Sequence, residues 1–405
     1  VSTLAAFFSA SGGASIGQYG PLVHFGTTIG AWLKQKMPFN FTPDLYIGAG
    51  VAASISSGFG APLAGLIFAH EAILRHYSHK SILAIATASG ISYAVSNAIW
   101  GDANVIAVSP NQFNLLLILL ISFLAGPIFG LIAILYMKSL LFFNKLANQN
   151  NFSLIYKYGV CVISLSIIGH FVPEVMGLGA ETVGGVLGSD YTLILLVVIL
   201  LGKILATSIS LNFGFFGGVF SPAILVGAGA GAVVSAILVS IGVFEQFQQA
   251  LVVSGIAAVA GAVIGAPLCM VIIVLELTNS YAYALASLVG LAISVGYVQV
   301  RFGSSYFDVQ LLNRGIDISD GRTGLFMYET EILEFAELNF QTVKESDSVE
   351  KAVSLMSNTS QSELIVLDAN DEFKGKINSL SLFNKSGTLL ESAVIDTNSI
   401  VIKHD

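Results

Sequence analysis

The sequence predicts an all-α polytopic membrane protein, internally duplicated and built with broken, re-entrant helices, that carries a small soluble α/β tail. Three observations support this fold class. Hydrophobic residues make up 55% of the 405 residues and charged residues only 10%, and the mean hydropathy is +0.81, far above that of soluble domains. Glycine and proline interrupt the apolar segments in a pattern that occurs twice. Beyond about residue 316, charged and polar residues become frequent.

The first interruption is a glycine-rich loop, Gly13–Gly20, which ends at Pro21 and leads into the apolar run 22–33. Proline fits the first turn of a helix because its missing N–H would have no partner there. Glycines let backbone amides crowd around a small guest, and the helix start adds partial positive charge. In a membrane, such irregular backbone persists only where protein buries it or where it lines a cavity. We therefore expect this loop to bind an anion.

A second loop repeats this device 201 residues later. Gly218 and Pro222 keep the spacing of Gly17 and Pro21, and the segment that follows is again glycine-rich and apolar. The alternative explanation is a pair of unrelated glycine and proline breaks in ordinary membrane helices.

Two further motifs follow the loops in the same order. Gly60-Ala-Pro-Leu63 is matched by Gly265-Ala-Pro-Leu268, and in each copy a glutamate, Glu71 or Glu276, lies 11 residues beyond the glycine. Because four features repeat in order, we infer an internally duplicated transporter whose broken helices meet near the membrane midplane. We expect the two glutamates to hold the geometry of the repeats by hydrogen bonding to backbone rather than to move protons.

Apolar runs between polar edges define the helices expected in residues 1–316. The runs 46–57 and 62–74 are shorter than the roughly 20 residues that a membrane span needs, as re-entrant helices would be. Pro127 is expected to kink the longest run without ending it. Residues 173–190 are too polar for lipid and predict an aqueous loop with one short helix. The expected helical segments are 1–10, 22–33, 46–57, 62–74, 82–100, 115–137, 155–172, 193–211, 223–243, 247–264, 267–278, 281–300 and 304–312.

Three residues inside the apolar runs call for an explanation. Lys203 is an intramembrane cation, and we weigh a functional role against snorkelling to an interface or neutralising a cluster of carbonyls. Cys161 and Cys269 have no metal-ligand spacing, so we expect buried free thiols and no disulfide framework.

The tail is expected to run in the order strand, helix, strand, turn, strand, helix. Asp347 or Ser348 is the expected N-cap of the first helix. Glu363–Leu367 is expected to be a strand, Asn370-Asp371 a turn, and 398–402 a further strand-like run. The buried stripe of the helix is expected at Val349, Ala352, Val353 and Met356.

Negative charge is concentrated in the tail. Residues 1–315 contain ten Lys or Arg and nine Asp or Glu, against seven and sixteen in residues 316–405, so the net charge of −8 belongs to the tail. This balance argues against nucleic acid as a partner. We divide the chain into a membrane domain at 1–316, a linker at 317–338 and a tail domain at 339–405. Because the chain starts inside an apolar run and stops in a strand-like run, we expect a piece of a longer protein.

Over most of residues 1–316 these motifs resemble the CLC family of chloride channels and proton/chloride antiporters, and the tail resembles a CBS domain. The resemblance rests on GASIGQYGP, GVFSP, the paired GAPL segments with their glutamates, PEVMGLGAETVGGVLG and KILATSISLNFGFFGGVFSPAILVGAGAG. It implies an inverted-repeat CLC-type fold, a homodimer with one pathway per subunit, and chloride or a similar anion as substrate. It also implies a multi-pass protein of a bacterial inner membrane, with its tail in the cytosol.

The resemblance also implies a set of anion-binding residues and no cofactor. The backbone amides of Val219 and Phe220 and the hydroxyl of Tyr306 would coordinate the central anion, and the loop Gly17–Pro21 would flank an external site. The family's serine loop, GSGIP, does not occur in this chain. Nucleotide binding at the tail is doubtful, since CBS domains normally work in pairs. The expected anion-binding residues are Gly17, Gln18, Tyr19, Gly20, Gly218, Val219, Phe220 and Tyr306.

Two positions depart from the family's pattern. Where the family usually has a gating glutamate, in GKEGP or GREGP, this chain has Tyr19. A tyrosine, with a pKa ordinarily near 10, stays neutral and cannot compete with chloride as a tethered anion. Ala72 stands where similar antiporters place an internal proton-transfer glutamate. We therefore expect passive chloride conduction or uncoupled transport, with a proton-coupled antiporter that uses other proton carriers as the alternative.

Functions of other classes explain less of the sequence. Residues 13–17 fit GxSxG, the motif of a serine hydrolase with Ser15 as nucleophile and His24 or His70 as base, but that motif needs a preceding strand. We otherwise expect His24 either to line the pore or to pack inside the protein, and we favour packing. A membrane-anchored nucleotide sensor would leave the glycine loops and Tyr306 unexplained, so we do not expect an enzyme or a sensor. No metal site is predicted, because a cluster of four residues lacks the spacing of a zinc motif and is better explained as solvated. These four are His70, Glu71, His76 and His79.

Overall fold

The computed structural model describes residues 2–37, 41–101, 108, 114–149, 153–242, 245–317, 340–359 and 361–382. The chain divides into two units, Val1–Leu325 and Phe326–Asp405. The predicted linker at 317–338, except residue 317, and the strand-like run at 398–402 lie outside the described residues.

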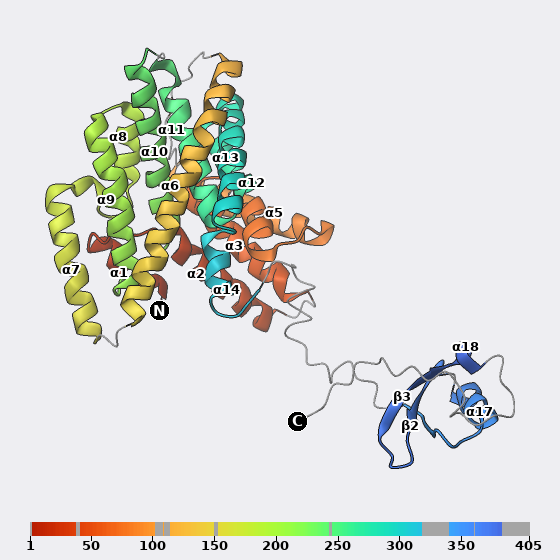
Figure 1. The fold of residues 1–405 in the computed structure, drawn as a ribbon. Helices are drawn as coiled ribbons and strands as arrows, with labels where there is room; N and C mark the ends of the chain where they lie inside the picture. The colour runs from red at the N-terminus through yellow and green to blue at the C-terminus, as the bar shows by residue number, and fades with distance from the viewer. Residues whose placement is uncertain are drawn as a thin grey trace. The chain divides into compact units, whose positions relative to one another are not determined.

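The first unit is built of helices throughout its described residues (Figure 1), which confirms the all-α prediction. Among these residues, 7 helical segments are long and apolar enough to cross a membrane, whereas the apolar segments Pro62–Leu74 and Pro267–Thr278 are shorter. In chain order the elements are α1 (Ser2–Ser11), α2 (Tyr19–Lys36), α3 (Pro43–Phe59), α4 (Pro62–Phe68), the π-helix η1 (Ala69–Leu74), α5 (His79–Trp100), α6 (Leu115–Gln149), α7 (Leu154–Phe171), the 3-10 helix η2 (Pro173–Val175), α8 (Ala180–Gly188), α9 (Leu193–Asn212), α10 (Phe220–Ser240), the 3-10 helix η3 (Glu245–Phe247), α11 (Gln248–Ile264), α12 (Pro267–Thr278), α13 (Tyr281–Arg301) and α14 (Tyr306–Leu312).

Two segments differ from their prediction. Helix α6 continues 12 residues past Met137 and contains Pro127 without a break. Its buried face, which includes Leu140 and Ala147, continues the same stripe, and so the helix does not end at the first lysine. Residues 173–190 contain the one short α-helix expected, α8, which packs against α10, and they also contain the 3-10 helix η2, which was not expected.

The duplication predicted from the glycine and proline motifs is visible in the packing. Helices α2 and α3 cross where a Cβ on Gly26 would lie 2.2 Å from the carbonyl oxygen of Gly50. Helices α10 and α11 cross where a Cβ on Gly227 would lie 2.5 Å from the carbonyl oxygen of Gly255. No real Cβ atom fits at such distances. Each repeat therefore uses a glycine pair to bring two helix backbones into contact.

The breaks between the paired helices are also equivalent. Gly60 and Gly265 end α3 and α11 in the left-handed conformation, with φ of 66° and 78°. Pro62 and Pro267 then occupy the first turns of α4 and α12, where a missing N–H costs nothing. The Gly-Ala-Pro-Leu motif is thus a helix stop followed at once by a helix start.

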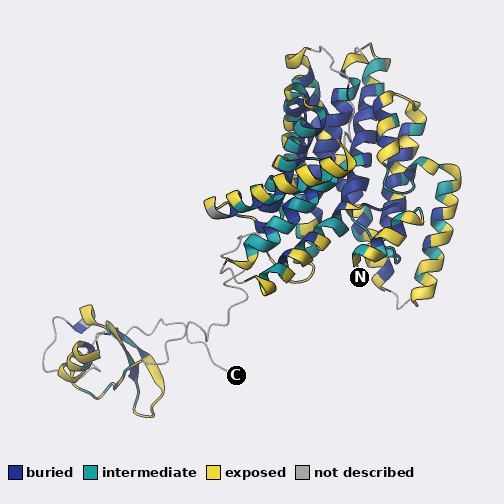
Figure 2. Cartoon of the chain, turned by 180° about the vertical axis from the view of Figure 1, so that it is seen from behind, coloured by how far each residue is buried: buried dark blue, intermediate teal, exposed yellow. Residues whose placement is uncertain are grey.

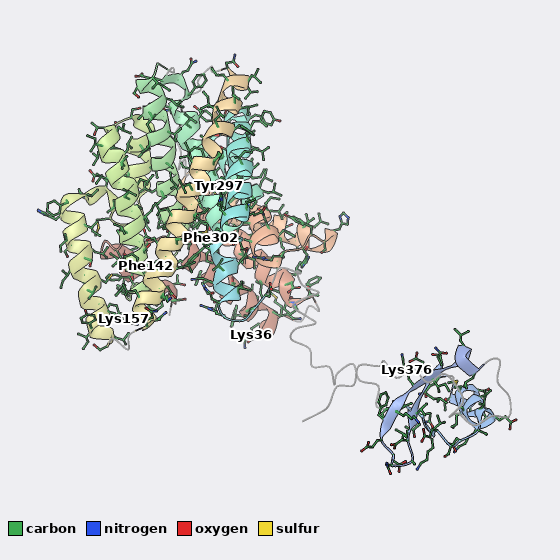
Figure 3. All side chains as sticks on the ribbon, viewed as in Figure 1. Lys36, Phe142, Lys157, Tyr297, Phe302 and Lys376 are labelled. Carbon is green, nitrogen blue, oxygen red and sulfur yellow. The ribbon has the colours of Figure 1, made fainter. Side chains whose placement is uncertain are left out.

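Buried residues, dark blue in Figure 2, concentrate in the interior of the helical unit. Helix α11 is buried along almost its whole length. Helices such as α5 and α7 instead expose large apolar side chains, as lipid-facing helices do. Basic residues occur near helix ends: Lys36 lies in the last turn of α2 and Lys157 in the first turn of α7 (Figure 3). Burial and charge together describe a membrane unit with a packed protein interior.

The second unit has the predicted order of elements. Strand β1 (Thr342–Lys344) pairs in parallel with β2 (Glu363–Leu367), and β2 pairs antiparallel with β3 (Phe373–Asn378). Helix α17 (Val349–Thr359) lies between β1 and β2 in the chain, and α18 (Ser379–Leu382) follows β3. The turn expected at Asn370-Asp371 is present between β2 and β3.

Two details of helix α17 refine the prediction. Of the two expected N-caps, Ser348 is the one whose Oγ accepts the backbone N–H of Lys351, at 3.3 Å. Val353 was expected in the buried stripe and is 47% exposed. The three-stranded sheet covers only a narrow face of this helix, which the other three residues of the stripe fill.

Candidate anion site at two converging helix starts

The two glycine-rich loops are hydrogen-bonded to each other. The backbone N–H of Gly17 donates to the carbonyl of Gly218, and that of Gly218 donates to the carbonyl of Gly17, both at 2.7 Å. The backbones meet so closely that a Cβ on Gly17 would lie 2.9 Å from the backbone nitrogen of Ser221 and 3.0 Å from Cδ of Pro222. Segments 201 residues apart in the sequence thus form one two-residue bridge, and glycine is required on both sides of it.

This bridge brings together the first turns of α2 and α10. The first N–H groups of a helix have no acceptor within the helix, and the helix start carries partial positive charge. In the described chain, no hydrogen bond is donated by the backbone amides of Val219 and Phe220. The predicted anion-binding residues that converge here are Gly17, Tyr19, Gly20, Gly218, Val219 and Phe220. Gln18, in contrast, is exposed.

Tyr19 lies in an aromatic cluster at this junction. Its ring stacks on Phe59 of α3, with centroids 3.7 Å apart and an interplanar angle of 11°, and lies 5.4 Å from the ring of Phe220. The rings of Phe59 and Phe220 are 5.2 Å apart. Tyr19 is 5% exposed, and its hydroxyl is contacted by the Gln18 side chain. Residue 19 is therefore a buried, uncharged ring in a three-ring cluster with Phe59 and Phe220.

Tyr136, a residue that the sequence analysis did not identify, joins α6 to the junction. Tyr136 of α6 is fully buried, and its hydroxyl donates to the carbonyl of Val219 at 3.4 Å. The same hydroxyl lies close to Thr207 and within electrostatic range of Tyr306. Among the described residues no hydrogen bond or ring contact joins Tyr306 directly to Val219 or Phe220. The signal for Tyr136 was its hydroxyl, which is an isolated polar group within a long apolar run.

Glu71 and Glu276 each cap the start of a short helix in the other repeat, α12 and α4 respectively. The carboxylate of Glu71 accepts the backbone N–H groups of Leu268 and Cys269, at 2.9 and 2.8 Å. The carboxylate of Glu276 accepts those of Leu63 and Ala64, both at 2.8 Å. A carboxylate that binds the free amides at a helix start is favourable both as a cap and by charge. The backbone hydrogen bonds expected for both glutamates are present, and their purely structural role stays a prediction.

The other polar candidates do not form a catalytic or metal site. Ser15 is buried and hydrogen-bonds Thr207, not a histidine. His24 is exposed on α2, so the packing role that we favoured for it from the sequence is wrong. His70 is fully buried, with its ring nitrogens at 3.0 Å from the carbonyl of Leu66 and 3.2 Å from Oγ of Ser81, and so it is not part of a solvated cluster. In the described chain no group of three or more His, Cys, Asp or Glu side chains is placed to hold a metal ion.

Lys203 is buried without a carboxylate partner among the described residues. Its Nζ donates to the carbonyls of Val175 and Gly177, at 3.0 and 2.9 Å, and the residue is 0% exposed. Snorkelling to an interface is therefore wrong. The N–H of Gly177 in turn donates to the carbonyl of Gly13, at 3.2 Å, so this cation stabilises the loop behind the first glycine-rich segment.

A profile of one protein family, described as Voltage gated chloride channel, matches residues 1–299. The chain belongs to this family, the CLC family. One curated CLC relative is the H(+)/Cl(-) exchange transporter ClcA of Vibrio vulnificus, which is 28% identical over 323 residues. The match covers 75% of this chain and 67% of that protein. An uncharacterized protein of Methanocaldococcus jannaschii is 26% identical over 298 residues, 71% of each chain.

Solved structures show the same CLC fold. A slow cyanobacterial Cl-/H+ antiporter superposes with a TM-score of 0.69 at 20% identity, covering 76% of this chain and 74% of the other. A CLC-type fluoride/proton antiporter superposes with a TM-score of 0.60 at 19% identity, covering 70% and 71%. A eukaryotic CLC transporter gives a TM-score of 0.61 at 19% identity, covering 89% and 65%. The protein is thus a multi-pass membrane protein with the inverted-repeat CLC fold, related to transporters rather than enzymes.

Proposed function

We propose that this protein conducts chloride, or a similar small anion, passively through the CLC-type pathway. The observation that carries the proposal is the ring of Tyr19, which stacks on Phe59 where the two helix starts converge. A carboxylate at this position would compete with an anion, and a neutral ring does not. Because Ala72 has no ionisable group and Tyr19 stays neutral at ordinary pH, neither position offers a carboxylate that could carry a proton.

The proposed ligands of the central anion are the amides of Val219 and Phe220 and the hydroxyl of Tyr306. Amides at a helix start are natural anion ligands, since they add the helix dipole to their own N–H groups. The hydrogen bond from Tyr136 to the Val219 carbonyl supports this assignment. That carbonyl and the N–H of Phe220 belong to the same peptide group, so the hydrogen bond fixes the orientation of this N–H. The loop Gly17–Gly20 would flank a second, outer position.

The test is transport by the full chain in phospholipid vesicles. Vesicles loaded with potassium chloride are diluted into a low-chloride buffer, and valinomycin is added to carry the compensating potassium. A chloride electrode and a pH electrode record the two ions together. We expect chloride efflux with no accompanying proton movement, and no efflux from protein-free vesicles. Proton movement against its own gradient, driven by chloride, would overturn the proposal.

Proton-coupled chloride exchange is the second candidate. It is favoured by the name of the Vibrio relative, an H(+)/Cl(-) exchange transporter. A row of buried hydroxyls also runs beside the junction, from Ser15 through Thr207 to Tyr136, and would be the alternative proton carrier. The vesicle experiment separates the two candidates, because exchange gives a fixed ratio of protons to chloride and passive conduction gives none.

The assembly and the setting of the protein belong to the same proposal. We propose a homodimer with one pathway in each subunit, in a bacterial inner membrane, with a CBS-like tail in the cytosol and no cofactor. The family supports this arrangement, and the exposed apolar side chains of α5, which include Leu83, Ile91 and Ile99, fit contact with lipid or with a second subunit.

A further inference from the structure

One hydroxyl beside the proposed anion site has no partner in the described chain. Ser221 is the second residue of α10, directly after Phe220, and is 8% exposed. Its Oγ is buried and makes no hydrogen bond. A buried hydroxyl without a partner is costly, because it has lost water and gained nothing in return. Among the described residues, Ser221 is therefore a donor without an acceptor.

The position of Ser221 in the helix explains why it cannot satisfy itself. Ser208 and Ser210 of α9 donate to carbonyls four residues back, both at 2.7 Å. Ser122 and Ser287 also lack a partner, but they lie inside α6 and α13, where rotation brings such a helical carbonyl within reach. Ser221 lies in the first turn, and no turn of α10 precedes it.

Ser221 also lies where the two loops meet. Its backbone nitrogen would be 2.9 Å from a Cβ on Gly17, which is the residue that bridges to Gly218. The amides of Val219 and Phe220, just before it in the chain, have no acceptor either. Two backbone donors and one side-chain donor thus occur on three consecutive residues at a helix start.

We propose that the hydroxyl of Ser221 is a further ligand of the anion that binds at the start of α10. This inference rests on the proposed function, because it adds one ligand to the same site. A halide accepts hydrogen bonds from several donors at once. The hydroxyl adds a neutral donor next to the two amides, and it therefore raises halide affinity without placing a competing charge in the pathway.

The experiment measures how chloride stabilises the full chain against thermal unfolding in detergent. A ligand that binds only the folded state raises the unfolding midpoint, and the stabilisation grows with the logarithm of ligand concentration divided by Kd. Wild type is compared with Ser221→Ala, with Ser221→Thr, which keeps the hydroxyl, and with Ser287→Ala, which removes another buried hydroxyl, from α13. Gluconate replaces chloride at constant ionic strength.

We expect Ser221→Ala to need about tenfold more chloride than wild type for the same shift, the effect of one lost hydrogen bond to an anion. Ser221→Thr and Ser287→Ala should respond to chloride like wild type. In gluconate, Ser221→Ala should be at least as stable as wild type, since it removes an unpaired polar group.

Two results would overturn the ligand role: the same chloride response in Ser221→Ala and wild type, or no chloride response in wild type. The proposed conduction fails separately, if the vesicles show no chloride flux. Should Ser221→Ala not fold, anomalous scattering from wild-type crystals grown in bromide decides. A bromide within about 3.5 Å of the Ser221 Oγ supports the proposal, and the absence of bromide at that distance contradicts it.

Discussion

At the scale of single residues, the proposed conduction depends on Tyr19. Its ring is stacked on Phe59 of α3 and lies against Phe220 of α10, and these two rings also lie close to each other. Such a stacked pair adds about 0.5–1.5 kcal/mol beyond the burial of the rings. A ring held in this way is neutral and fixed, whereas a carboxylate would be charged and would be drawn to the amides of the two helix starts.

Replacing the ring by a carboxylate should therefore create pH dependence. In Tyr19→Glu we expect chloride flux to fall by about tenfold or more as pH rises and the new carboxylate ionises. Flux through the wild type should not change over the same range, because a tyrosine remains neutral there. Flux from vesicles between pH 4 and pH 8 is the measurement, and Tyr19→Phe, which keeps the stacked ring, is the control. A Tyr19→Glu profile as flat as that of wild type would show that residue 19 lies outside the anion pathway.

Sequence reasoning identified residues that belong to a pattern and missed those that act alone. The spacing of Gly17 and Gly218 predicted two equivalent loops, and the loops are in contact. Tyr136 belongs to no motif, and its link to the Val219 carbonyl depends on how α6 packs, which no local pattern encodes. His24 was misjudged for the same reason, because the side of α2 that faces outward is set by its neighbours.

At the scale of elements, the crossed glutamates join the two repeats. Each carboxylate binds two amides of the other repeat's broken helix, so α4 and α12 have their free N–H groups satisfied in trans. Glu71 lies in a π-helical turn, Ala69–Leu74, where the backbone is wider than in an α-helix. Glu276 lies in a regular α-helix. The sequence showed the duplication but not this difference in backbone.

Removing either charge should weaken both repeats. Glu71→Gln and Glu276→Gln should each cost about 1–2 kcal/mol of stability, since an amide side chain satisfies two N–H groups less well than a carboxylate. Thermal unfolding in detergent measures the loss. If the role is structural, proton movement in the vesicle assay should be the same in both variants as in wild type. A variant with wild-type stability and altered proton movement would contradict the structural role.

The glycine crossings give a second prediction at this scale. Gly26→Ala and Gly227→Ala would place a Cβ within 2.2 Å and 2.5 Å of a backbone oxygen on the facing helix. Each should cost about 1–3 kcal/mol in unfolding free energy, because whole helices must separate. Gly159→Ala on α7 is the matched control, as its Cβ would meet nothing within 4 Å, and it should be neutral or slightly stabilising. Similar stability of all three variants would contradict the close packing.

At the scale of the whole molecule, the chain combines two units whose interiors are built differently. The membrane unit has a large core to which most of its helices contribute. The tail unit has a small core in its described residues, centred on Val343, Val366 and Ile377. Surface charge matters more for such a small unit. The Lys351 ammonium, with the N–H of Lys344, lowers the pKa of the Asp347 carboxyl.

The tail should therefore open first in acid. A carboxyl whose pKa is lower in the folded state adds stability above its ordinary pKa, and this stability is lost as pH falls through the folded value. For Asp347 the loss occurs below about pH 4. Hydrogen exchange of the full chain at decreasing pH should show loss of protection in α17 before the membrane helices, and Asp347→Asn should remove this pH step. Equal protection of both units down to pH 3 would contradict the prediction.

The extent of agreement between sequence and structure also differs between the units. The ends of the membrane helices agree with the prediction within a few residues, because long apolar runs leave little choice. The exception is α6, whose buried stripe continues beyond the end of its apolar run. In the tail, Val353 was misplaced because a helix of 11 residues offers several faces and the sheet selects one of them.

The crossed caps have a consequence for biosynthesis. Leu63 and Ala64 are synthesised more than 200 residues before Glu276. Until the second repeat is inserted, the backbone N–H groups of these two residues therefore lack the carboxylate that accepts them in the folded protein. Each half therefore needs the other to complete its hydrogen bonds. Two polypeptides divided between α6 and α7 and synthesised together should consequently find each other in the bilayer, whereas either fragment produced alone should be degraded by quality-control proteases.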